Sequence, residues 1–346
     1  MSPHLQASVA SSAPEGWNEF VERCPAASIY HRADWLNLVS STFGHRVHFI
    51  GVRDDAGTLR GVLPLVQQRS LLFGNFLTSL PFFNYGGPLF DSADAYQALL
   101  SEAERLARRL GVRHVELRTQ LKDGLGWMHR DDKVTLIRDL PSTVDALSAE
   151  MGSKLRSQIR RVERENPVIW KGGIELAGSF YHVFSRNMRD LGTPVYPRRF
   201  FEDMLRRFPN DCRIVCVELR GVPAAAGFLI THKGTTEIPW ASCLTEMKPL
   251  GANMRLYWEC LCEALNLGSQ RFDFGRSSVD AGTYRFKLQW GAKPVPLHWY
   301  YWLPSGSELP QLHHGNAKLA LAIRAWKRLP LWACEALGPH LIRNLP

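Results

Sequence analysis

The sequence lacks several features that would assign it to a common class. It has no CxxC pair, and no histidine stands at zinc-finger spacing from its seven cysteines, so we predict no structural metal. It has no GxSxG motif, and Cys24 has no recognisable base motif beside it, so we predict no covalent nucleophile. The sequence also has no run of about 18 uninterrupted apolar residues, which a membrane-spanning helix requires.

The cysteines and the N-terminal segment favour a cytoplasmic protein. An odd number of cysteines in mostly apolar contexts is typical of reduced, buried thiols. The segment 1–17 lacks the positive start and the continuous apolar core of a secretory signal. We expect this start of the chain to be flexible.

The composition is that of a globular protein with a basic surface. The chain has 346 residues, 45% of them hydrophobic and 22% charged, which is enough for two ordinary domains. The net charge is +9 and the pI is near 9.3. This balance favours polyanionic or phosphorylated partners or an anionic membrane surface, and a generic basic surface remains the alternative.

Two parts of the chain repeat one order of elements. The hairpin CRIVCVELRGVPAAAGFLI echoes HFIGVRDDAGTLRGVLPLV, and EALNLGSQRFDFG echoes ERLARRLGVRHVELR. Gly268 follows Gly111 by 157 residues, the interval that also separates Phe272 from Val115. We therefore predict two related mixed α/β domains, 1–150 and 151–305, with a helical tail at 306–346.

Periodicity and capping residues locate the elements of the first half. The helix that ends the first half is expected to be capped by Ser142. The other expected elements are helices Ala33–Ser41 and Ala93–Leu110 and strands Val47–Arg53, Leu59–Gln67, Val112–Arg118 and Val134–Asp139.

The stretch 271–303 has the most distinctive pattern in the chain. Phe272 and Phe274 flank Asp273 in a half-buried strand that is expected to end at Gly275. After a polar loop, Thr283 is expected to cap a helix over 284–290, which Gly291 closes, and a strand is expected over 295–303. Lys287 shares a face of this helix with Tyr284 and Trp290, beside aromatic surface that makes an unpaired ammonium costly.

The segment FDFGRSSVDAGTYRFKLQWGAKP resembles the C-terminal signature of the FemAB-related proteins. These are GNAT-like acyltransferases that include peptidoglycan aminoacyltransferases. More narrowly, the segment is similar to the FemAB-like proteins associated with exosortase and PEP-CTERM systems. The resemblance implies twin GNAT-like domains, each a twisted mixed sheet flanked by helices. It also implies that Phe286 and Lys287 match a Phe-Lys pair at the acyl-transfer centre.

Lys287 is the leading catalytic candidate. Acyl transfer to an amine passes through a tetrahedral intermediate, and a fixed cation can stabilise its oxyanion. The alternative is a lysine that extends from the edge of the Phe286 and Trp290 cluster to water. Asp273, or Asp280 in the polar loop, is a candidate to receive the amine proton.

A second candidate site is the helix start after the apolar strand 238–244. GNAT enzymes bind the pyrophosphate of acetyl-CoA on a turn that begins with Gln or Arg and has Gly three residues later and Gly or Ala two after that. Lys248, Gly251, Ala252 and Asn253 have this spacing, but Lys248 and Asn253 depart from the pattern. Backbone N–H groups at a helix start suit an anion, and an ordinary helix start is the alternative.

Two further segments carry candidate substrate contacts. Arg156, Arg160 and Arg164 recur every four residues in a basic helix, which forms either a stripe for the phosphates of tRNA or a solvated face. The remaining substrate-binding candidates are Arg189, Asp190, Tyr196 and Arg198 in the loop 187–204, Arg276 and Tyr284 near Lys287, and the turn Asn84–Gly87.

The tail 318–346 is expected to be helical with a break at Pro330. Its apolar positions are Leu319, Ile323 and Trp326, and its basic positions are Lys318, Arg324, Lys327 and Arg328. The tail either packs against the body of the protein or lies on the anionic surface of the inner membrane.

The sequence thus predicts a cytoplasmic N-acyltransferase with no tightly bound cofactor. Its donor would be acyl-CoA or aminoacyl-tRNA, and its acceptor an amine of a cell-envelope precursor, either peptidoglycan or exopolysaccharide. The alternative is a non-catalytic protein that binds such a precursor in an exosortase or exopolysaccharide system.

Overall fold

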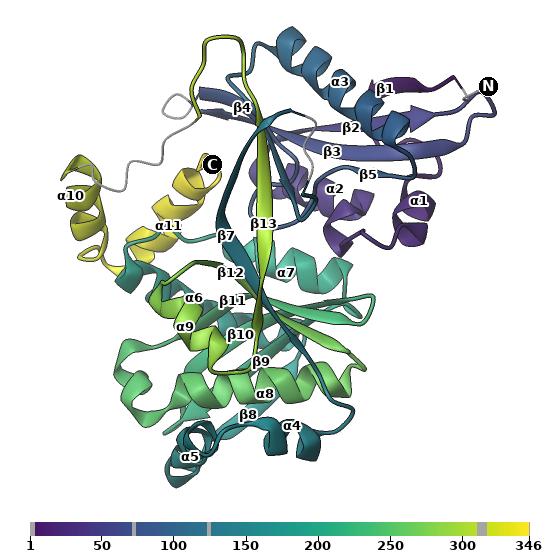
Figure 1. The fold of residues 1–346 in the computed structure, drawn as a ribbon. Coiled ribbons are helices and arrows are strands. Elements are labelled where there is room, and N and C mark those ends of the chain that lie inside the picture. The colour runs from purple at the N-terminus through teal and green to yellow at the C-terminus, as the bar shows by residue number, and fades with distance from the viewer. Residues whose placement is uncertain (1–3, 71–73, 123–125, 310–316, 346) are drawn as a thin grey trace. The chain divides into compact units, whose positions relative to one another are not determined.

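Residues 4–70, 74–122, 126–309 and 317–345 are described by a computed structural model (Figure 1). They divide into two compact units. Unit 1 contains Met1–Lys133, Pro296–Gln311 and Asn344–Pro346, and unit 2 contains Val134–Val295 and Leu312–Arg343. The chain passes from one unit to the other within strands β7 (Met128–Asp139) and β13 (Lys293–Trp302), so neither unit is a single segment of sequence.

The sheet of unit 1 is mixed. Its strands follow the order β1-β2-β3-β4-β6, and residues His298–Trp302 of β13 pair antiparallel with β6. The first four strands are antiparallel neighbours, whereas β4 and β6 are parallel. The bounds are β1 (Gln6–Ala10), β2 (Arg46–Arg53), β3 (Leu59–Ser70), β4 (Gly74–Thr78), β5 (Leu89–Phe90), which pairs with β3, and β6 (Val115–Thr119).

Helices cover both faces of this sheet. Side chains alternate along β2, so neighbouring residues of this strand pack against helices on opposite faces. Ile50 packs in one core with Leu99 of helix α3 (Ala93–Leu110). Phe49 points to the other face and meets Trp17 edge to face, with ring centroids 5.0 Å apart. Trp17 begins helix α1 (Trp17–Arg23), which precedes the 3-10 turn η1 (Ile29–His31) and α2 (Ala33–Phe43).

The expected flexible start is wrong, because Gln6–Ala10 pairs with β2 in full register. This segment has few large apolar side chains, and backbone pairing at a sheet edge does not require them.

Unit 2 repeats the topology of unit 1. Its strands follow the order β8-β9-β10-β11-β12-β7, with antiparallel neighbours from β8 to β11 and a parallel pair β11–β12. Gly111 and Gly268 each follow a long helix, and both have a positive φ, as the repeat predicts. The predicted tandem mixed α/β architecture is confirmed. The bounds are β8 (Val168–Gly172), β9 (Cys212–Leu219), β10 (Val222–His232), β11 (Thr235–Cys243) and β12 (Arg271–Ser278).

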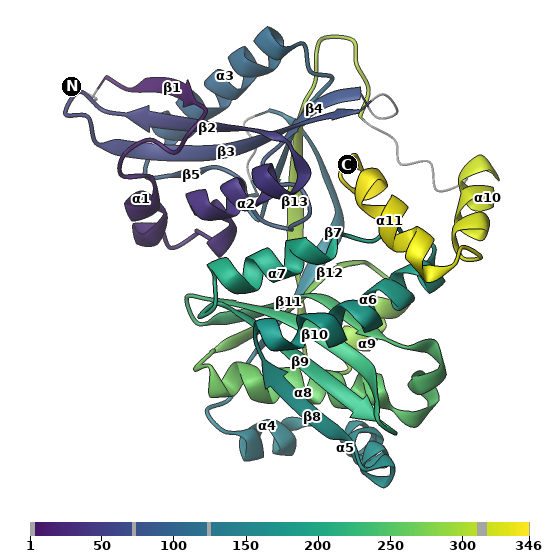
Figure 2. The ribbon, with the colours of Figure 1, turned by 180° about the vertical axis from the view of Figure 1, so that it is seen from behind.

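The sheet of unit 2 also has helices on both faces (Figure 2). Gly227 of β10 lies under Cys260 of α8 (Ala252–Asn266), where a Cβ atom would come within 3.1 Å of the sulfur. Its neighbour Phe228 points to the opposite face and packs on Phe180 of α6 and Phe201 of α7. The other helices of the unit are α4 (Val144–Glu150), α5 (Ser153–Arg161), η2 (Val162–Glu165), η3 (Ile174–Leu176), α6 (Ala177–Leu191), α7 (Arg198–Arg207), η4 (Thr245–Leu250), α9 (Gly282–Leu288), α10 (Ala317–Trp326) and α11 (Leu331–Ile342).

Two predicted caps are wrong by one or two residues. Thr143, not Ser142, caps α4, because its hydroxyl accepts from the N–H of Ala146 at 3.2 Å. Helix α9 begins after Ala281, and the Thr283 hydroxyl lies 3.4 Å from Ser277 Oγ instead. Asp280 has a φ of 64°, and this left-handed residue turns the chain early enough for the helix to begin at Gly282.

The C-terminal helices pack on unit 2 through one face. Pro330 separates α10 from α11, as expected. Gly338 of α11 lies so close to Val195 that a Cβ atom would stand 2.7 Å from its backbone nitrogen. The side chains of Lys318 and Leu319 lie outside the described part of the structure.

This close approach makes Gly338→Ala a test of the packing. Alanine ordinarily stabilises a helix relative to glycine, but here its methyl group meets backbone and is expected to destabilise the packing by about 1–3 kcal/mol. Trypsin should cut faster after Lys327 and Arg328 in this variant. In Gly282→Ala, where nothing lies within 4 Å, the cutting rate should not change. Equal rates in the two variants would contradict the packing described here.

Candidate functional site

Lys287 lies on helix α9 and bonds to strand β12 through its side chain. Figure 1 labels both elements. Its side chain is 7% exposed. The ammonium donates to the carbonyl oxygens of Gly275 and Arg276, at 2.8 and 2.9 Å. An ammonium has three donors, and the described residues engage two of them. The third makes no hydrogen bond with a described residue.

Burial changes the acid strength of this group. Desolvation lowers the pKa of Lys287 to about 8, because the ammonium loses its hydration in the protein interior. The charges of Asp273 and Glu237 oppose this change, and that of Arg276 adds to it. The ammonium is therefore a stronger hydrogen-bond donor and a more easily lost proton than that of an exposed lysine.

The backbone that accepts from Lys287 is itself fixed by a buried carboxylate. Asp273 Oδ1 accepts from the N–H of Gly275 at 2.8 Å and from the hydroxyl of Thr135 on β7. Gly275 has a φ of 75°, which favours glycine and turns its carbonyl at this point of the strand. Strand β12 continues to Ser278, so the expected end at Gly275 is a kink within the strand.

Aromatic side chains form the apolar wall beside Lys287. Phe286 meets Tyr257 of α8 edge to face at 4.9 Å and also contacts Trp290. Trp290 is fully buried, and Tyr284 packs against the same core. The predicted grouping of Tyr284, Phe286 and Trp290 around the lysine thus corresponds to one packed cluster, and this cluster desolvates the ammonium.

The sequence interpretation missed two partners of this site. Thr135 donates to Asp273 from a strand 138 residues earlier. Glu237 lies opposite Asp273 in the parallel pair β11–β12 and is 7% exposed. A glutamate directly before the apolar stretch that starts at Ile238 is the signal in the sequence for this buried ion. The contact of Thr135 with Asp273 depends on which strands pair, and no local sequence pattern predicts that pairing.

The helix start proposed for a pyrophosphate is partly occupied by the protein itself. Gly251 precedes α8 with a φ of 88°, and a Cβ atom there would stand 2.7 Å from Val162 Cγ2. The backbone N–H of Asn253 is directed at the thiol of Cys243. Lys248 is exposed in η4, and Ala252 is buried. Two groups at this turn are thus engaged by the protein's own residues.

The predicted arginine stripe does not form as one helical row. Arg156 donates to the carbonyls of Ser148 and Met151, so its guanidinium closes the end of α4. Arg160 is exposed on α5. Arg164 lies in the 3-10 turn η2, where the helical spacing of four no longer holds. Of the three, Arg160 and Arg164 stay exposed.

The acceptor candidates between α6 and α7 are held by local contacts. Arg189 donates to Asp190 at 2.8 Å, and Arg198 donates to Glu202 at 2.8 Å. The Tyr196 ring packs against Trp240 and Phe200. Arg276 is exposed on β12, next in sequence to the carbonyl of Gly275 that accepts from Lys287. Arg276 and Tyr284 are therefore the substrate candidates nearest Lys287 along the chain.

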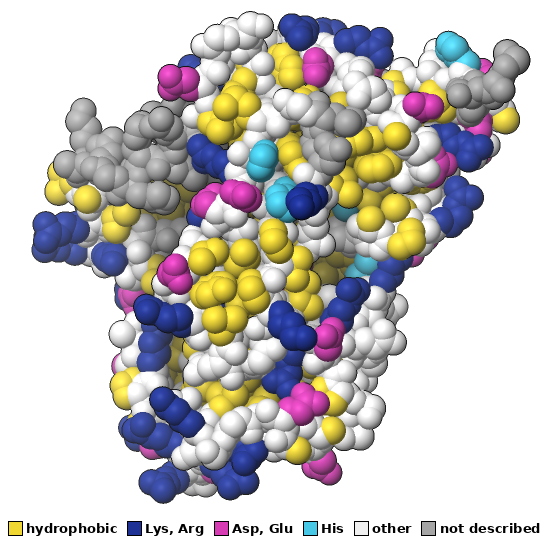
Figure 3. All heavy atoms as spheres, viewed as in Figure 1, with side chains coloured by type: hydrophobic (Ala, Val, Ile, Leu, Met, Phe, Trp, Pro, Cys, Tyr) yellow, Lys and Arg dark blue, Asp and Glu magenta, His cyan; other side chains and the backbone are white. Residues whose placement is uncertain are grey.

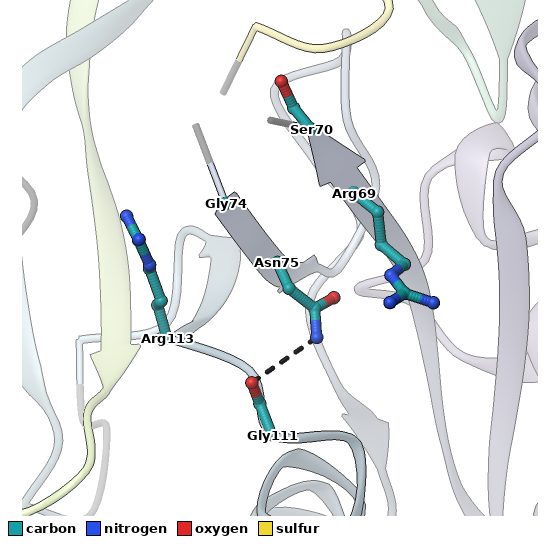
Figure 4. A pocket seen from close by; sticks show the side chains of 6 residues that line it. All are labelled: Arg69, Ser70, Gly74, Asn75, Gly111 and Arg113. Carbon is teal, nitrogen blue, oxygen red and sulfur yellow. Dashed lines mark hydrogen bonds between the residues drawn. The ribbon is translucent and has the colours of Figure 1, made fainter. Parts of the chain in front are cut away.

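Unit 1 contains a cavity of about 430 Å³ that none of the predicted site residues lines (Figure 4). Arg69 and Arg113 give it a basic lining. The Asn75 amide in its wall donates to the carbonyls of Leu110 and Gly111 and so closes the end of α3.

In the predicted turn 84–87, the carbonyl of Gly87 lies 2.9 Å from His31 Nε2.

The described residues give no sign of two other kinds of site. They contain no cluster of three side chains that would suit a metal ion. None of their helices is long and apolar enough to cross a membrane. None of the seven cysteines forms a disulfide, and six of them are buried.

Residues 150–288, which include Lys287, match the family described as "Acetyltransferase (GNAT) domain". No curated protein matches the chain.

Several solved structures share the fold. The crystal structure of FemX is 13% identical, with a TM-score of 0.66 over 85% of this chain and 97% of FemX. The structure of L-PGS from Bacillus licheniformis is 13% identical, with a TM-score of 0.58 over 92% of this chain and 98% of that protein. A tandem GNAT protein from the clavulanic acid biosynthesis pathway, also 13% identical, has a TM-score of 0.55 over 88% of this chain and 100% of that protein. Residues 150–288 are thus similar to the GNAT acetyltransferase domain, and the chain shares its fold with FemX and a tandem GNAT protein.

Proposed function

We propose that this protein transfers an activated acyl or aminoacyl group to an amine of a cell-envelope precursor in the cytoplasm. The observation that carries the proposal is the buried Lys287 ammonium, which two backbone carbonyls hold in a fixed position. The GNAT domain match includes this residue. The resemblance to exosortase-associated FemAB-like proteins supports a peptidoglycan or exopolysaccharide precursor as the acceptor.

The proposed reaction needs no covalent intermediate with the protein. The acceptor amine attacks the carbonyl carbon of a thioester or ester, a C–N bond forms, and the C–S or C–O bond to the donor breaks. Negative charge develops on the carbonyl oxygen between these events, and the third N–H of Lys287 would donate to it. The departing thiolate or alkoxide takes up the proton that the amine releases, directly or through Asp273, and leaves as a thiol or hydroxyl.

Asp273 has two proposed roles. Its carboxylate is a candidate to receive the amine proton, as the sequence suggested. It also accepts from the N–H of Gly275 and so fixes the backbone that holds Lys287. The second role rests on hydrogen bonds of the structure, so Asp273 is at least a positioning residue. Asp280 is exposed in the polar loop.

The donor is acyl-CoA or aminoacyl-tRNA. The exposed Arg160 and Arg164 and the net charge of +9 favour a phosphate-rich donor of either kind. No tightly bound cofactor is proposed.

The packed start of α8 favours one alternative function. The Gly251 N–H donates to the carbonyl of Lys248 at 3.0 Å, and the Asn253 N–H is directed at the thiol of Cys243, so this turn is a poor match to the pyrophosphate turn of CoA-dependent enzymes. The alternative is a non-catalytic protein that binds a cell-envelope precursor.

A thermal-shift titration separates these possibilities. A ligand at about 100 times its dissociation constant adds roughly 2.7 kcal/mol of stability if it binds only the folded state. We expect a saturable rise in Tm with either acetyl-CoA or charged tRNA. The tRNA response should weaken steeply with salt, because counterion release drives that binding. No shift with any acyl-CoA or charged tRNA would favour the non-catalytic alternative.

Lys287→Ala is expected to lower the transfer rate by about 10² to 10³ without unfolding the protein. The loss follows because the variant has no cation to stabilise the oxyanion. Single-turnover transfer from the donor identified above measures it, and circular dichroism checks the fold. Lys287→Arg keeps the positive charge and should retain more activity than the alanine variant. Full turnover in Lys287→Ala would refute the proposed role.

The lowered pKa of Lys287 should be visible in stability without any substrate. The folded state releases the proton near pH 8, whereas the unfolded lysine releases it near 10.5. Between these values the unfolded state binds more protons, so the free energy of unfolding rises with pH. Relative to Lys287→Met, the wild-type protein should gain up to about 3 kcal/mol over this window. Denaturant unfolding at several pH values measures this difference, and a constant difference would show that the pKa is not lowered.

A further inference from the structure

Helices α10 and α11 have large apolar side chains that do not pack against the rest of unit 2. Four large side chains of this pair are well exposed: Leu321 at 68%, Trp332 at 72%, Leu337 at 50% and Leu341 at 42%. They are four of the thirteen large hydrophobic side chains exposed in the described part of the chain, and they fall within 21 residues of sequence. An exposed cluster of this kind usually marks a surface that binds something.

The two faces of α11 are separated by helical spacing. Cys334, Gly338 and Ile342 follow one another at intervals of four and are all buried. Leu337 and Leu341, also four apart, form the adjoining exposed row. Trp332 is exposed at the start of the same helix. The buried row accounts for the packing on unit 2, and the exposed side of α11 is left without a partner.

Basic side chains accompany the exposed apolar ones. In α10, Leu321 and Arg324 are three residues apart and therefore lie on one face. Lys327 and Arg328 follow directly, and both are exposed. Arg328 is four residues after Arg324, whereas the stem of Lys327 lies beside Gly192 at the edge of this face. Figure 3 shows hydrophobic and basic side chains together at the surface of α10, at the left edge of the view. Residues 320–345 contain four basic side chains and a single acidic one, Glu335.

This combination fits an anionic bilayer surface. An interfacial helix buries leucine and tryptophan at the headgroup level while lysine and arginine reach anionic lipid headgroups. A soluble protein partner would need matching acidic groups and an apolar surface of its own, whereas an anionic membrane supplies both features without a specific fold. The pair has no membrane-spanning helix, so the contact would be peripheral.

We propose that the exposed face of α10 and α11 binds the surface of an anionic membrane. Its apolar side chains are Leu321, Trp332, Leu337 and Leu341, and its basic side chains are Arg324, Lys327 and Arg328. The proposal does not depend on acyl transfer, because these residues lie outside the GNAT domain match.

Vesicle cosedimentation of the full chain tests the proposal. The probes are vesicles of phosphatidylcholine alone and of phosphatidylcholine with phosphatidylglycerol. We expect binding to the second kind only, and weaker binding as salt rises. Each basic side chain near an anionic surface contributes about fivefold in affinity, so the variant Arg324→Gln, Lys327→Gln, Arg328→Gln should bind about 100-fold more weakly.

Apolar variants separate membrane insertion from charge attraction. The double variant Trp332→Ser, Leu337→Ser should lose at least tenfold in affinity for the anionic vesicles. The matched control is Trp170→Ser, which removes a tryptophan that is 49% exposed on β8, and it should bind like the wild-type protein. All substituted side chains are exposed, so the fold should survive, and circular dichroism checks this.

Three outcomes would overturn the proposal. The first is no binding of the wild-type chain to anionic vesicles. The second is equal loss in Trp170→Ser and in the double variant. The third is self-association in analytical ultracentrifugation that the double variant abolishes while vesicle binding stays unchanged, because the face would then join two copies of the chain.

Discussion

The candidate site depends on one buried ammonium. Lys287 links α9 to the kinked part of β12, and its hydrogen bonds to two consecutive carbonyls require the backbone to turn at Gly275. Asp273 fixes that turn from the other side through the N–H of Gly275. Removing an ion from water costs several kcal/mol even when it is paired. In return for this desolvation cost, the fold holds the Lys287 ammonium in a fixed position. A fixed positive charge can stabilise an oxyanion as it develops.

The two halves of the repeat treat equivalent carboxylates differently. Glu116 of β6 and Asp273 of β12 are 157 residues apart, the interval of the repeat, and both are buried. Burial raises the pKa of Glu116, but the guanidinium of Arg118 outweighs this effect, and the net pKa lies below its usual range. Arg118 comes from the same strand, with its Nε 2.6 Å from Glu116 Oε1. Unit 1 thus closes this position with a local ion pair, whereas in unit 2 a lysine from the following helix faces it.

The sequence predicted the repeat, the helix Ala93–Leu110 and the grouping of Lys287 with Tyr284, Phe286 and Trp290, because periodicity and glycine placement are local signals. It could not predict that Thr135 donates to Asp273, since that contact depends on which strands pair. It also placed Arg156 in a row with Arg164, because spacing alone does not reveal that α5 changes to a 3-10 turn after Arg161. The donor, the acceptor and the membrane contact stay proposals.

The chain passes between the two units within β7 and β13, and this affects how the protein folds during synthesis. Strand β6 of unit 1 pairs with β13, and the Tyr300 hydroxyl donates to the carbonyl of Leu121, 179 residues earlier. The N-terminal unit therefore leaves the ribosome with one edge of its sheet open and waits for most of the chain before it can close. Contacts of such sequence separation slow folding, and an open strand edge invites pairing with other chains. This topology thus delays the closure of the unit 1 sheet until β13 has been synthesised.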